Sequence, residues 1–322
     1  MAGADVPRSD SPGHAEPGEP VALVLGAGGA RGLAQIGVIE ALQARKLRIV
    51  AVAGSSSGAL VGGLFAAGKM AVYRDWLYSM SRTAMLRLLD PVFGQPALFR
   101  GDRLMHALRE LIGEPRIEDL PVQFTAVAVD LLRQREVWLR EGDLWDAIRA
   151  SIAIPGVFTP YELHGRELVD GGLLAPLPIT ATRLSDAHRL IAVDMHGWPD
   201  QPTGTLGRHA STDAPRHAPV PAEQLVSLKP PPLSRWFRRN RAVPAETPED
   251  SPPHELSFSE LMARSLDTMQ AQIARVQLAL DPPELVIRIP RDACQFYEFW
   301  RAKELIELGR EQAEQALDKA GY

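Results

Sequence analysis

Two short glycine-rich segments limit most strongly the folds that this chain can adopt. Residues 26–32 read Gly-Ala-Gly-Gly-Ala-Arg-Gly and follow an apolar run at 21–25. Residues 54–58 read Gly-Ser-Ser-Ser-Gly and follow a second apolar run at 49–53. Each segment precedes a helix-like pattern, and strands that alternate with helices favour a parallel sheet covered by helices on both faces. The sequence therefore predicts an α/β fold with two glycine-rich strand-to-helix turns.

The second segment has the G-x-S-x-G pattern of a serine on a tight strand-to-helix turn. Gly54 and Gly58 stand two positions to either side of Ser56. They relieve crowding, so that the hydroxyl can project toward a substrate. Ser55 and Ser57 lack this pair of glycines. Ser56 is therefore the candidate nucleophile, and the alternative is a packing turn whose glycines only admit a close helix.

The first segment is a loop of backbone N–H groups at the start of a helix. Such groups suit negative charge that develops during a reaction, so the candidate oxyanion-hole donors are the amides of Gly28, Gly29, Ala30 and Arg31. A dinucleotide fingerprint would need glycine or alanine at the position of Arg31. A phosphate-binding P-loop would need a Gly-Lys-Ser/Thr sequence, which does not follow.

A serine hydroxyl is a weak nucleophile and needs a base within hydrogen-bond reach. No histidine follows His254, whereas an α/β-hydrolase would place its histidine late in the chain. We expect His164 in a turn and His196 just after a strand, both with solvated or structural roles. Asp170 is the better candidate, because the two glycines after it leave the approach to a serine open. Taken alone, this Asp-Gly-Gly sequence fits an ordinary turn better.

Three signatures in one order make the chain resemble the patatin-like phospholipases, in their bacterial branch related to neuropathy target esterase. They are the glycine-rich loop that ends at Gly32, the turn centred on Ser56 and the Asp-Gly-Gly sequence at 170–172. Residues 150–158 and 296–317 also look like the family. The resemblance covers roughly residues 20–197 and 257–318. The family usually has glycine where this chain has Ala27.

This resemblance implies a patatin-like three-layer fold with a central, mostly parallel sheet and a Ser–Asp dyad that works without histidine. Ser56 would attack an acyl carbonyl, and Asp170 would accept its proton. The implied enzyme is a serine acyl hydrolase of lipid degradation, which cleaves fatty acyl esters of phospholipids, lysophospholipids or related lipids and needs no cofactor. The alternatives are a non-catalytic interaction or regulatory protein on the same scaffold and a Ser-His-Asp esterase.

Further along the chain, periodic apolar residues predict a helical stretch at 71–89 and helices at 102–112, 144–154, 257–280 and 297–319. They also predict strands at 123–129, 189–194 and 285–289 and a hairpin at 161–169. We divide the chain into a disordered N-terminal tail, 1–19, and a patatin-like domain, 20–322. A flexible insertion at 197–255 interrupts this domain, because that stretch holds twelve of the 27 prolines.

The composition argues against several other functions. The net charge of −5 and the pI near 5.9 give no reason to expect nucleic-acid binding. The single cysteine, Cys294, can form no internal disulfide. No cluster of cysteine and histidine has metal-ligand spacing, so we expect no metal.

We expect a cytoplasmic protein that contacts membranes peripherally. Residues 1–20 lack the apolar core of a secretory signal. The uncharged stretch 49–68 is long enough to span a membrane, but its three consecutive serines and five glycines favour a buried strand, a turn and a helix. A cluster within the insertion would make the membrane contact, with a solvated loop as the alternative. Its residues are Arg235, Trp236, Phe237, Arg238, Arg239 and Arg241.

Overall fold

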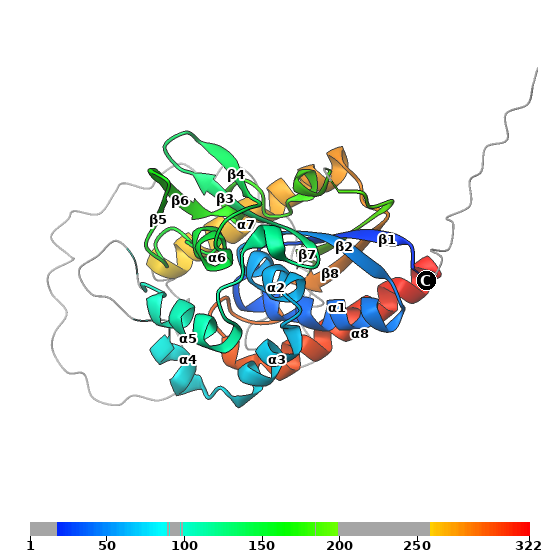
Figure 1. Ribbon diagram of the computed structural model, residues 1–322, viewed down its shortest axis with the longest axis horizontal. Coiled ribbons are helices and arrows are strands. Elements are labelled where there is room, and N and C mark those ends of the chain that lie inside the picture. Colours follow the sequence, from blue (N-terminus) through cyan, green and yellow to red (C-terminus); the bar gives the residue numbers. More distant parts are fainter. Residues whose placement is uncertain (1–17, 89, 91–96, 98, 184, 199–257) are drawn as a thin grey trace, which may run out of the picture. The chain divides into compact units, whose positions relative to one another are not determined.

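The computed structural model describes residues 18–88, 90, 97, 99–183, 185–198 and 258–322 (Figure 1). The chain divides into two units, residues 1–200 with 262–322 and residues 201–261, and the sheet lies in the first. Most of the predicted N-terminal tail and insertion lies outside the described residues, as does the whole arginine and aromatic cluster at 235–241.

An eight-stranded sheet organises the first unit, in the order β5-β6-β3-β2-β1-β7-β8, with β4 paired to β3 off this path. One block of strands is parallel throughout: β1 (Pro20–Leu25), β2 (Arg48–Ser55), β3 (Gln123–Asp130), β7 (Arg189–Gly197) and β8 (Leu285–Pro290). Three strands add antiparallel pairs beside β3: β4 (Arg135–Leu139), β5 (Tyr161–Leu163) and β6 (Arg166–Asp170). The expected α/β fold with a mostly parallel sheet is therefore confirmed.

The central strands are apolar on both faces because helices cover the sheet from both sides. On β1, Leu23 and Leu25 join the main core, which includes the helices α1 (Ala34–Ala44), α2 (Ser57–Ala66) and α8 (Ala302–Ala320). Val24 points the other way and packs with Ala274 of α7 (Phe258–Leu280). This alternation is the period-two pattern of a strand buried on both faces.

The remaining helices differ from the sequence prediction at several boundaries. The helical stretch expected at 71–89 is two helices, α3 (Met70–Ser79) and α4 (Arg82–Leu88). Helix α5 (Asp102–Ile112) has its expected bounds. Helix α6 (Leu144–Ser151) ends before the expected residue 154, because a residue that precedes proline, here Ile154, is disfavoured in the helical conformation.

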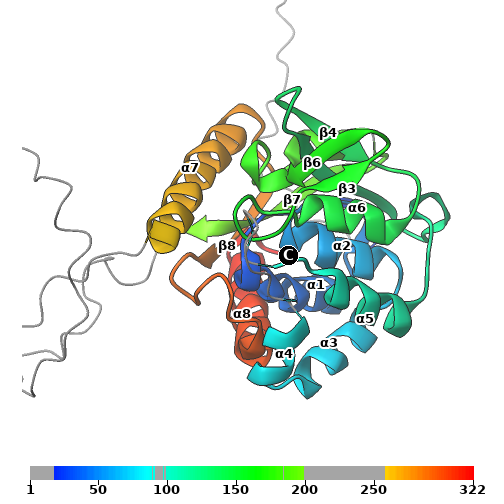
Figure 2. The same cartoon turned by 90° about the vertical axis from the view of Figure 1, so that its left-hand side faces the viewer.

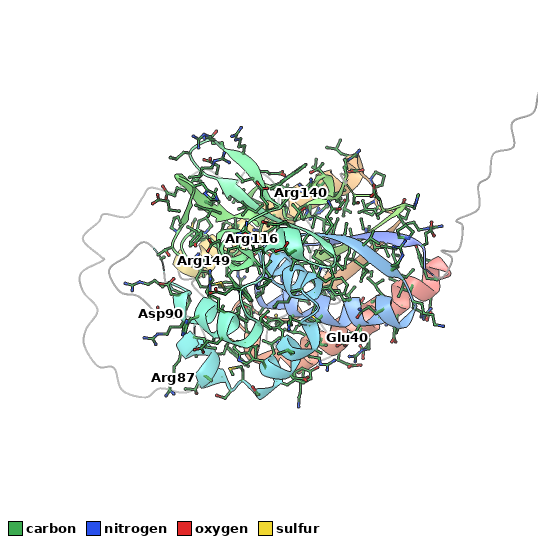
Figure 3. The ribbon with its side chains drawn as sticks, viewed as in Figure 1. Glu40, Arg87, Asp90, Arg116, Arg140 and Arg149 are labelled. Atoms are coloured by element: carbon green, nitrogen blue, oxygen red, sulfur yellow. The ribbon has the colours of Figure 1, made fainter. Side chains whose placement is uncertain are left out.

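Helices α1, α3 and α8 are tied together by one carboxylate. Glu40 of α1, which is labelled in Figure 3, accepts a hydrogen bond from Arg74 of α3 and another from Arg310 of α8, each 2.7 Å long. All three side chains are between one fifth and one third exposed. Partly exposed ion pairs of this kind contribute little individually, so packing must account for most of the adhesion between these helices.

Glycines allow α1 and α8 to approach closely. A Cβ atom on Gly37 of α1 would lie 1.8 Å from the carbonyl oxygen of Ile306. A Cβ atom on Gly309 of α8 would lie 1.8 Å from the carbonyl oxygen of Ala34. Backbone atoms cannot rotate away as side chains do, so the two helices would have to separate to admit even a methyl group.

We therefore expect Gly37→Ala to lower the free energy of unfolding by about 2 kcal/mol. Overpacking against backbone costs up to about 3 kcal/mol, and the better helix propensity of alanine returns about 1 kcal/mol. Urea denaturation would measure this change. Gly63→Ala in α2 is the matched control, because its new Cβ would meet no backbone but only side-chain ends, those of Ile148 and Leu144 at 3.1 Å and that of Phe124 at 3.3 Å. Equal stability of Gly37→Ala and wild type would contradict the prediction.

Candidate active site

Ser56 lies on a sharp turn between β2 and α2, with φ 56° and ψ −125°. A non-glycine residue at positive φ is uncommon, and such strain gathers at functional sites. The turn brings backbones into close contact. A Cβ atom on Gly54 would lie 2.3 Å from the Gly58 carbonyl oxygen, and one on Gly58 would lie 2.1 Å from that of Leu25. Both flanking glycines are therefore required by the path of the chain.

Ser151 holds this turn from the end of α6. Its hydroxyl accepts a hydrogen bond from the Ser56 N–H, 3.0 Å long, and donates one to the Val127 carbonyl on β3, 2.6 Å long. Ser151 is fully buried. Residues 150–158 look like the family, but no sequence pattern assigns a role to Ser151, because its partners are 95 and 24 residues away in the chain.

Asp170 ends β6, where it pairs with Ala128 of β3. Its Oδ1 accepts a hydrogen bond of 2.7 Å from the Gly172 N–H. Its Oδ2 is buried and has no well-formed hydrogen bond to the described residues. Burial raises the pKa of this carboxyl to about 7, although the nearby Ser56 hydroxyl and the Gly172 amide each lower it.

The structure brings Asp170 and Ser56 together. The Ser56 hydroxyl lies close enough to the Asp170 carboxyl to lower its pKa. The turn after Asp170 also packs on the turn of Ser56. A Cβ atom on Gly171 would lie 3.0 Å from the Ser55 hydroxyl, which itself donates to the Ala175 carbonyl at 2.6 Å.

The glycine-rich loop follows β1 beside the same edge of the sheet, because Leu25 of β1 is in register with Gly54 of β2. Two of its four expected donors are already engaged. The Ala30 N–H donates to the Phe296 carbonyl at 2.8 Å, and the Arg31 N–H donates to the Gly28 carbonyl at 3.2 Å. The expectation of four available amides is therefore corrected. Among the described residues, the N–H groups of Gly28 and Gly29 have no hydrogen-bond partner.

A narrow apolar cavity of about 50 Å³ adjoins Ser56. Gly29, Ser56 and Ser57 are among the residues that line it. Its other walls are apolar side chains from α2 to α5, from the loop before β5 and from the short 3-10 helix before α8, among them Leu60, Trp76, Met85, Leu104, Phe158 and Phe299. A cavity of this volume holds one or two water molecules. A longer apolar group could enter only if these side chains moved apart.

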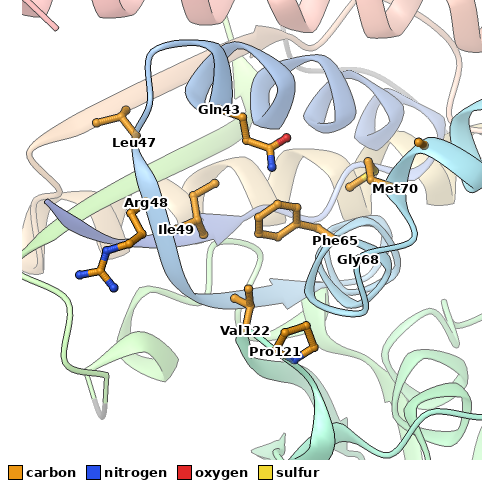
Figure 4. Close-up of a pocket in the computed structure, with 10 residues that line it drawn as sticks. Gln43, Leu47, Arg48, Ile49, Phe65, Gly68, Met70, Pro121 and Val122 are labelled. Carbon is orange, nitrogen blue, oxygen red and sulfur yellow. The ribbon is translucent and has the colours of Figure 1, made fainter. Parts of the chain in front are cut away.

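A larger cavity of about 420 Å³ lies at the opposite edge of the sheet (Figure 4). It is bordered by Ile49 at the start of β2 and by Val122 just before β3. Arg48 also lines this cavity, and in Figure 4 its side chain points away from Phe65. The length of β2 separates it from Ser56 by roughly 25 Å. This cavity therefore contributes nothing to the site around Ser56.

The histidines lie apart from the contacts of Ser56. His164 is exposed on the turn between β5 and β6, as the sequence predicted. The side chain of His196, the last but one residue of β7, is buried. Its Nδ1 lies 3.5 Å from Asp194, and its Nε2 lies 3.8 Å from Asp267 of α7. Nothing in the described contacts joins either histidine to Ser56.

Comparison with known proteins decides the family. The family model of patatin-like phospholipases matches residues 23–183, which include the glycine-rich loop, Ser56 and Asp170. This chain belongs to the patatin-like phospholipase family. An uncharacterized NTE family protein of Mycobacterium tuberculosis is 40% identical to it, over 92% of this chain and 91% of that protein. The patatin-like fold inferred from the sequence is thereby confirmed.

Two longer patatin-like relatives match only part of the chain. Patatin-like phospholipase domain-containing protein 6 of Homo sapiens is 30% identical over 59% of this chain and 14% of its own length. Lysophospholipase NTE1 of Saccharomyces cerevisiae is 29% identical over 57% of this chain and 11% of its own length. Within the described part of this patatin-like chain, no helix is both long and apolar enough to cross a membrane, and no cluster of acidic, histidine or cysteine side chains could hold a metal ion.

We expect Ser151→Ala to lower the free energy of unfolding by about 2–4 kcal/mol. The change leaves the Ser56 N–H and the Val127 carbonyl buried without a partner, at about 1–3 kcal/mol each. Urea denaturation would measure it. Ser79→Ala is the control, because that exposed hydroxyl donates only to the Trp76 carbonyl in its own helix, and we expect less than about 0.5 kcal/mol there. Similar small losses in both variants would contradict this role of Ser151.

Asp170→Asn should be more stable than wild type at pH 8 and similar to it at pH 4. The pKa of the buried carboxyl is raised from its usual value near 4 to about 7, so ionisation costs free energy in the folded state. The stability of the wild type therefore falls as the pH rises from about 4 to 7, whereas the neutral amide has no such loss. Urea denaturation at both pH values tests this, with Asp186→Asn as the exposed control. A less stable Asp170→Asn protein at pH 8 would refute it.

Proposed function

We propose that this protein is a serine acyl hydrolase that cleaves fatty acyl esters of phospholipids, lysophospholipids or related lipids. The observation that carries the proposal is the pairing of Ser56, on its strained turn, with the buried carboxyl of Asp170. Membership of the patatin-like phospholipase family and similarity to a protein named lysophospholipase support the substrate class.

In the proposed reaction, the Ser56 hydroxyl oxygen attacks the acyl carbon of the ester, and its proton moves to Oδ2 of Asp170. Collapse of the tetrahedral intermediate breaks the ester bond, and Asp170 returns the proton to the departing alcohol. Water then attacks the acyl-serine while Asp170 again accepts a proton. That proton finally returns to Ser56 as the fatty acid leaves.

Asp170 is suited to this work because its pKa is close to neutral. A general base is most effective when its pKa lies near the working pH. An ordinary aspartate, with a pKa near 4, is a much weaker proton acceptor, and burial raises the pKa of Asp170 to about 7. Its Oδ2 has no other well-formed hydrogen bond among the described residues, so this oxygen is available to the serine proton.

The negative charge on the substrate carbonyl oxygen would be stabilised by the amides of Gly28 and Gly29. These N–H groups are free of hydrogen bonds within the described part of the loop, and Gly29 shares a cavity with Ser56. The apolar walls of that cavity suit an acyl chain, which could enter once these side chains move apart, since each buried methylene contributes about 0.8 kcal/mol. The proposed membrane contact through residues 235–241 would bring such a lipid to the site, but that segment lies outside the described residues.

The two alternatives have less support. A Ser-His-Asp esterase would need a histidine beside Ser56, and the one buried histidine among the described residues, His196, contacts Asp194 and Asp267 instead. A non-catalytic scaffold would have no use for a buried carboxyl without a full set of hydrogen bonds, which costs stability.

We expect Ser56→Ala to abolish ester hydrolysis and covalent labelling by a fluorophosphonate, and Asp170→Asn to lower kcat by a factor of about 10⁴ or more. Members of one catalytic unit each lose nearly the whole effect. In wild type, kcat/KM should fall as the pH drops below about 7, because protonated Asp170 cannot act as a base. The assay follows hydrolysis of a soluble short-chain ester.

His164→Ala is the control, and its kcat should equal that of wild type. Circular dichroism would establish that each variant is folded. Persistent labelling of folded Ser56→Ala would overturn the assignment of the nucleophile. An active Asp170→Asn protein together with an inactive His196→Ala protein would replace the dyad with a histidine triad.

A further inference from the structure

The side chain of Arg31 points back into the protein and fastens the glycine-rich loop. Arg31 is only 5% exposed. Its Nη1 donates to the Arg291 carbonyl at 2.8 Å, its Nε donates to the Gly28 carbonyl at 3.4 Å, and its Nη2 pairs with Asp267 of α7. The proposed oxyanion donors are backbone amides of this loop, whereas these contacts are made by the Arg31 side chain.

The contact with Gly28 determines where the next amide points. The Gly28 carbonyl accepts hydrogen bonds from both the N–H and the Nε of Arg31. A trans peptide group is planar, so its N–H points away from its carbonyl oxygen. The N–H of the same peptide group belongs to Gly29, which has φ 56° and lines the cavity of Ser56. By holding one side of this peptide group, Arg31 fixes the direction of the amide on the other side.

Asp267 is the carboxylate that keeps the Arg31 guanidinium in place. A nearly buried guanidinium without a counter-charge would turn toward water and release the carbonyl groups that it holds. Asp267 is one third exposed, and the side chain of Arg31 is 6% exposed. His196 Nε2 lies 3.8 Å from the same carboxylate oxygen but has no hydrogen bond, so Arg31 is the closer partner.

Helix α7 presents Asp267 from a fixed position. Ala271 and Ala274, one and two turns further along, are buried against the unit, and Ala274 belongs to the core cluster with Val24 of β1. Gln277 accepts a hydrogen bond from the Leu177 N–H, 3.2 Å long. Figure 2 shows α7 lying along one side of the sheet. Packing of α7 therefore fixes the position of Asp267, and Asp267 in turn fixes the position of the Arg31 side chain beside the loop.

We propose that Asp267 is a positioning residue for ester hydrolysis: it holds Arg31, which aligns the Gly28–Gly29 peptide group so that the Gly29 amide faces the developing oxyanion. The inference rests on the proposed function. It assigns a role to a helix that lies outside the matched family region, residues 23–183.

A purely structural role for the ion pair makes a different prediction, and the chain contains a matched control. Arg183 pairs with Asp281, directly after the end of α7, through bonds of 3.0 and 2.7 Å. This second pair also joins the α7 region to the rest of the unit but contacts no part of the glycine-rich loop. If Asp267 only fastens the helix, Asp267→Asn and Asp281→Asn should have the same effect.

The experiment measures kcat and KM for a soluble short-chain ester, beside Ser56→Ala. We expect Asp267→Asn to lower kcat by about 10- to 100-fold, less than the roughly 10²–10³-fold loss when an oxyanion donor is removed outright. KM should change by less than about threefold, because the amide acts mainly in the transition state. Asp281→Asn should keep the kcat of wild type, and Asp267→Glu should recover part of the loss.

Arg31→Lys tests the same link from the other side, because lysine keeps the charge but cannot hold both Asp267 and the Gly28 carbonyl. We expect Arg31→Lys to lower kcat. The double variant Arg31→Lys with Asp267→Asn should have a kcat no lower than that of the less active single variant, because both changes break the same link. If Asp267→Asn does not fold, Arg31→Lys alone decides, and a wild-type kcat there overturns the proposal.

Three further results would overturn the inference. They are an unchanged kcat in Asp267→Asn, an effect on KM alone, and an equal loss of kcat in Asp281→Asn. If wild type hydrolyses the ester and Ser56→Ala does not, these results leave the proposed function standing. A folded wild-type protein that hydrolyses no ester would remove both.

Discussion

The positive φ of Ser56 is the constraint on which the rest of the site depends. Strain of this kind costs about 1–3 kcal/mol and persists only where the surroundings enforce it. Here the Ser56 N–H is held by Ser151, and its carbonyl accepts the N–H groups of Ala59 and Leu60 at the start of α2. Strand, helix and the end of α6 thus fix one residue from three directions.

The same site contains groups that weaken the folded state. Burial holds the pKa of Asp170 well above the usual range, and its Oδ2 and the Ser57 hydroxyl are buried without well-formed hydrogen bonds to the described residues. The extensive core around α1, α2 and α8 compensates for these costs. Packing within the same unit therefore offsets the groups that weaken the folded state at the proposed site.

The local parts of the fold and site could be predicted from the sequence. The turn at Ser56 follows from two glycines at fixed offsets, and β2 and α2 follow from apolar runs beside them. Contacts between distant residues could not be predicted. Ser151 meets Ser56 across 95 residues, and Asp267 meets Arg31 across 236. For the same reason, the hydrogen bond from the Ala30 N–H to the Phe296 carbonyl could not be predicted, since no local sequence pattern indicates which loops pack together.

The contact between α7 and the glycine-rich loop has a consequence for how such a chain can vary. A helix turns by about 100° per residue. One residue inserted in α7 after Asp267 would therefore swing the carboxylate away from Arg31 if the buried face at Ala271 and Ala274 kept its packing. Residues before the helix face no such requirement, because the spacing from Asp267 to the buried alanines is the same whatever precedes it. The number of residues between β7 and α7 can therefore vary without moving Asp267, whereas the ten-residue spacing from Asp267 to Gln277 must be kept.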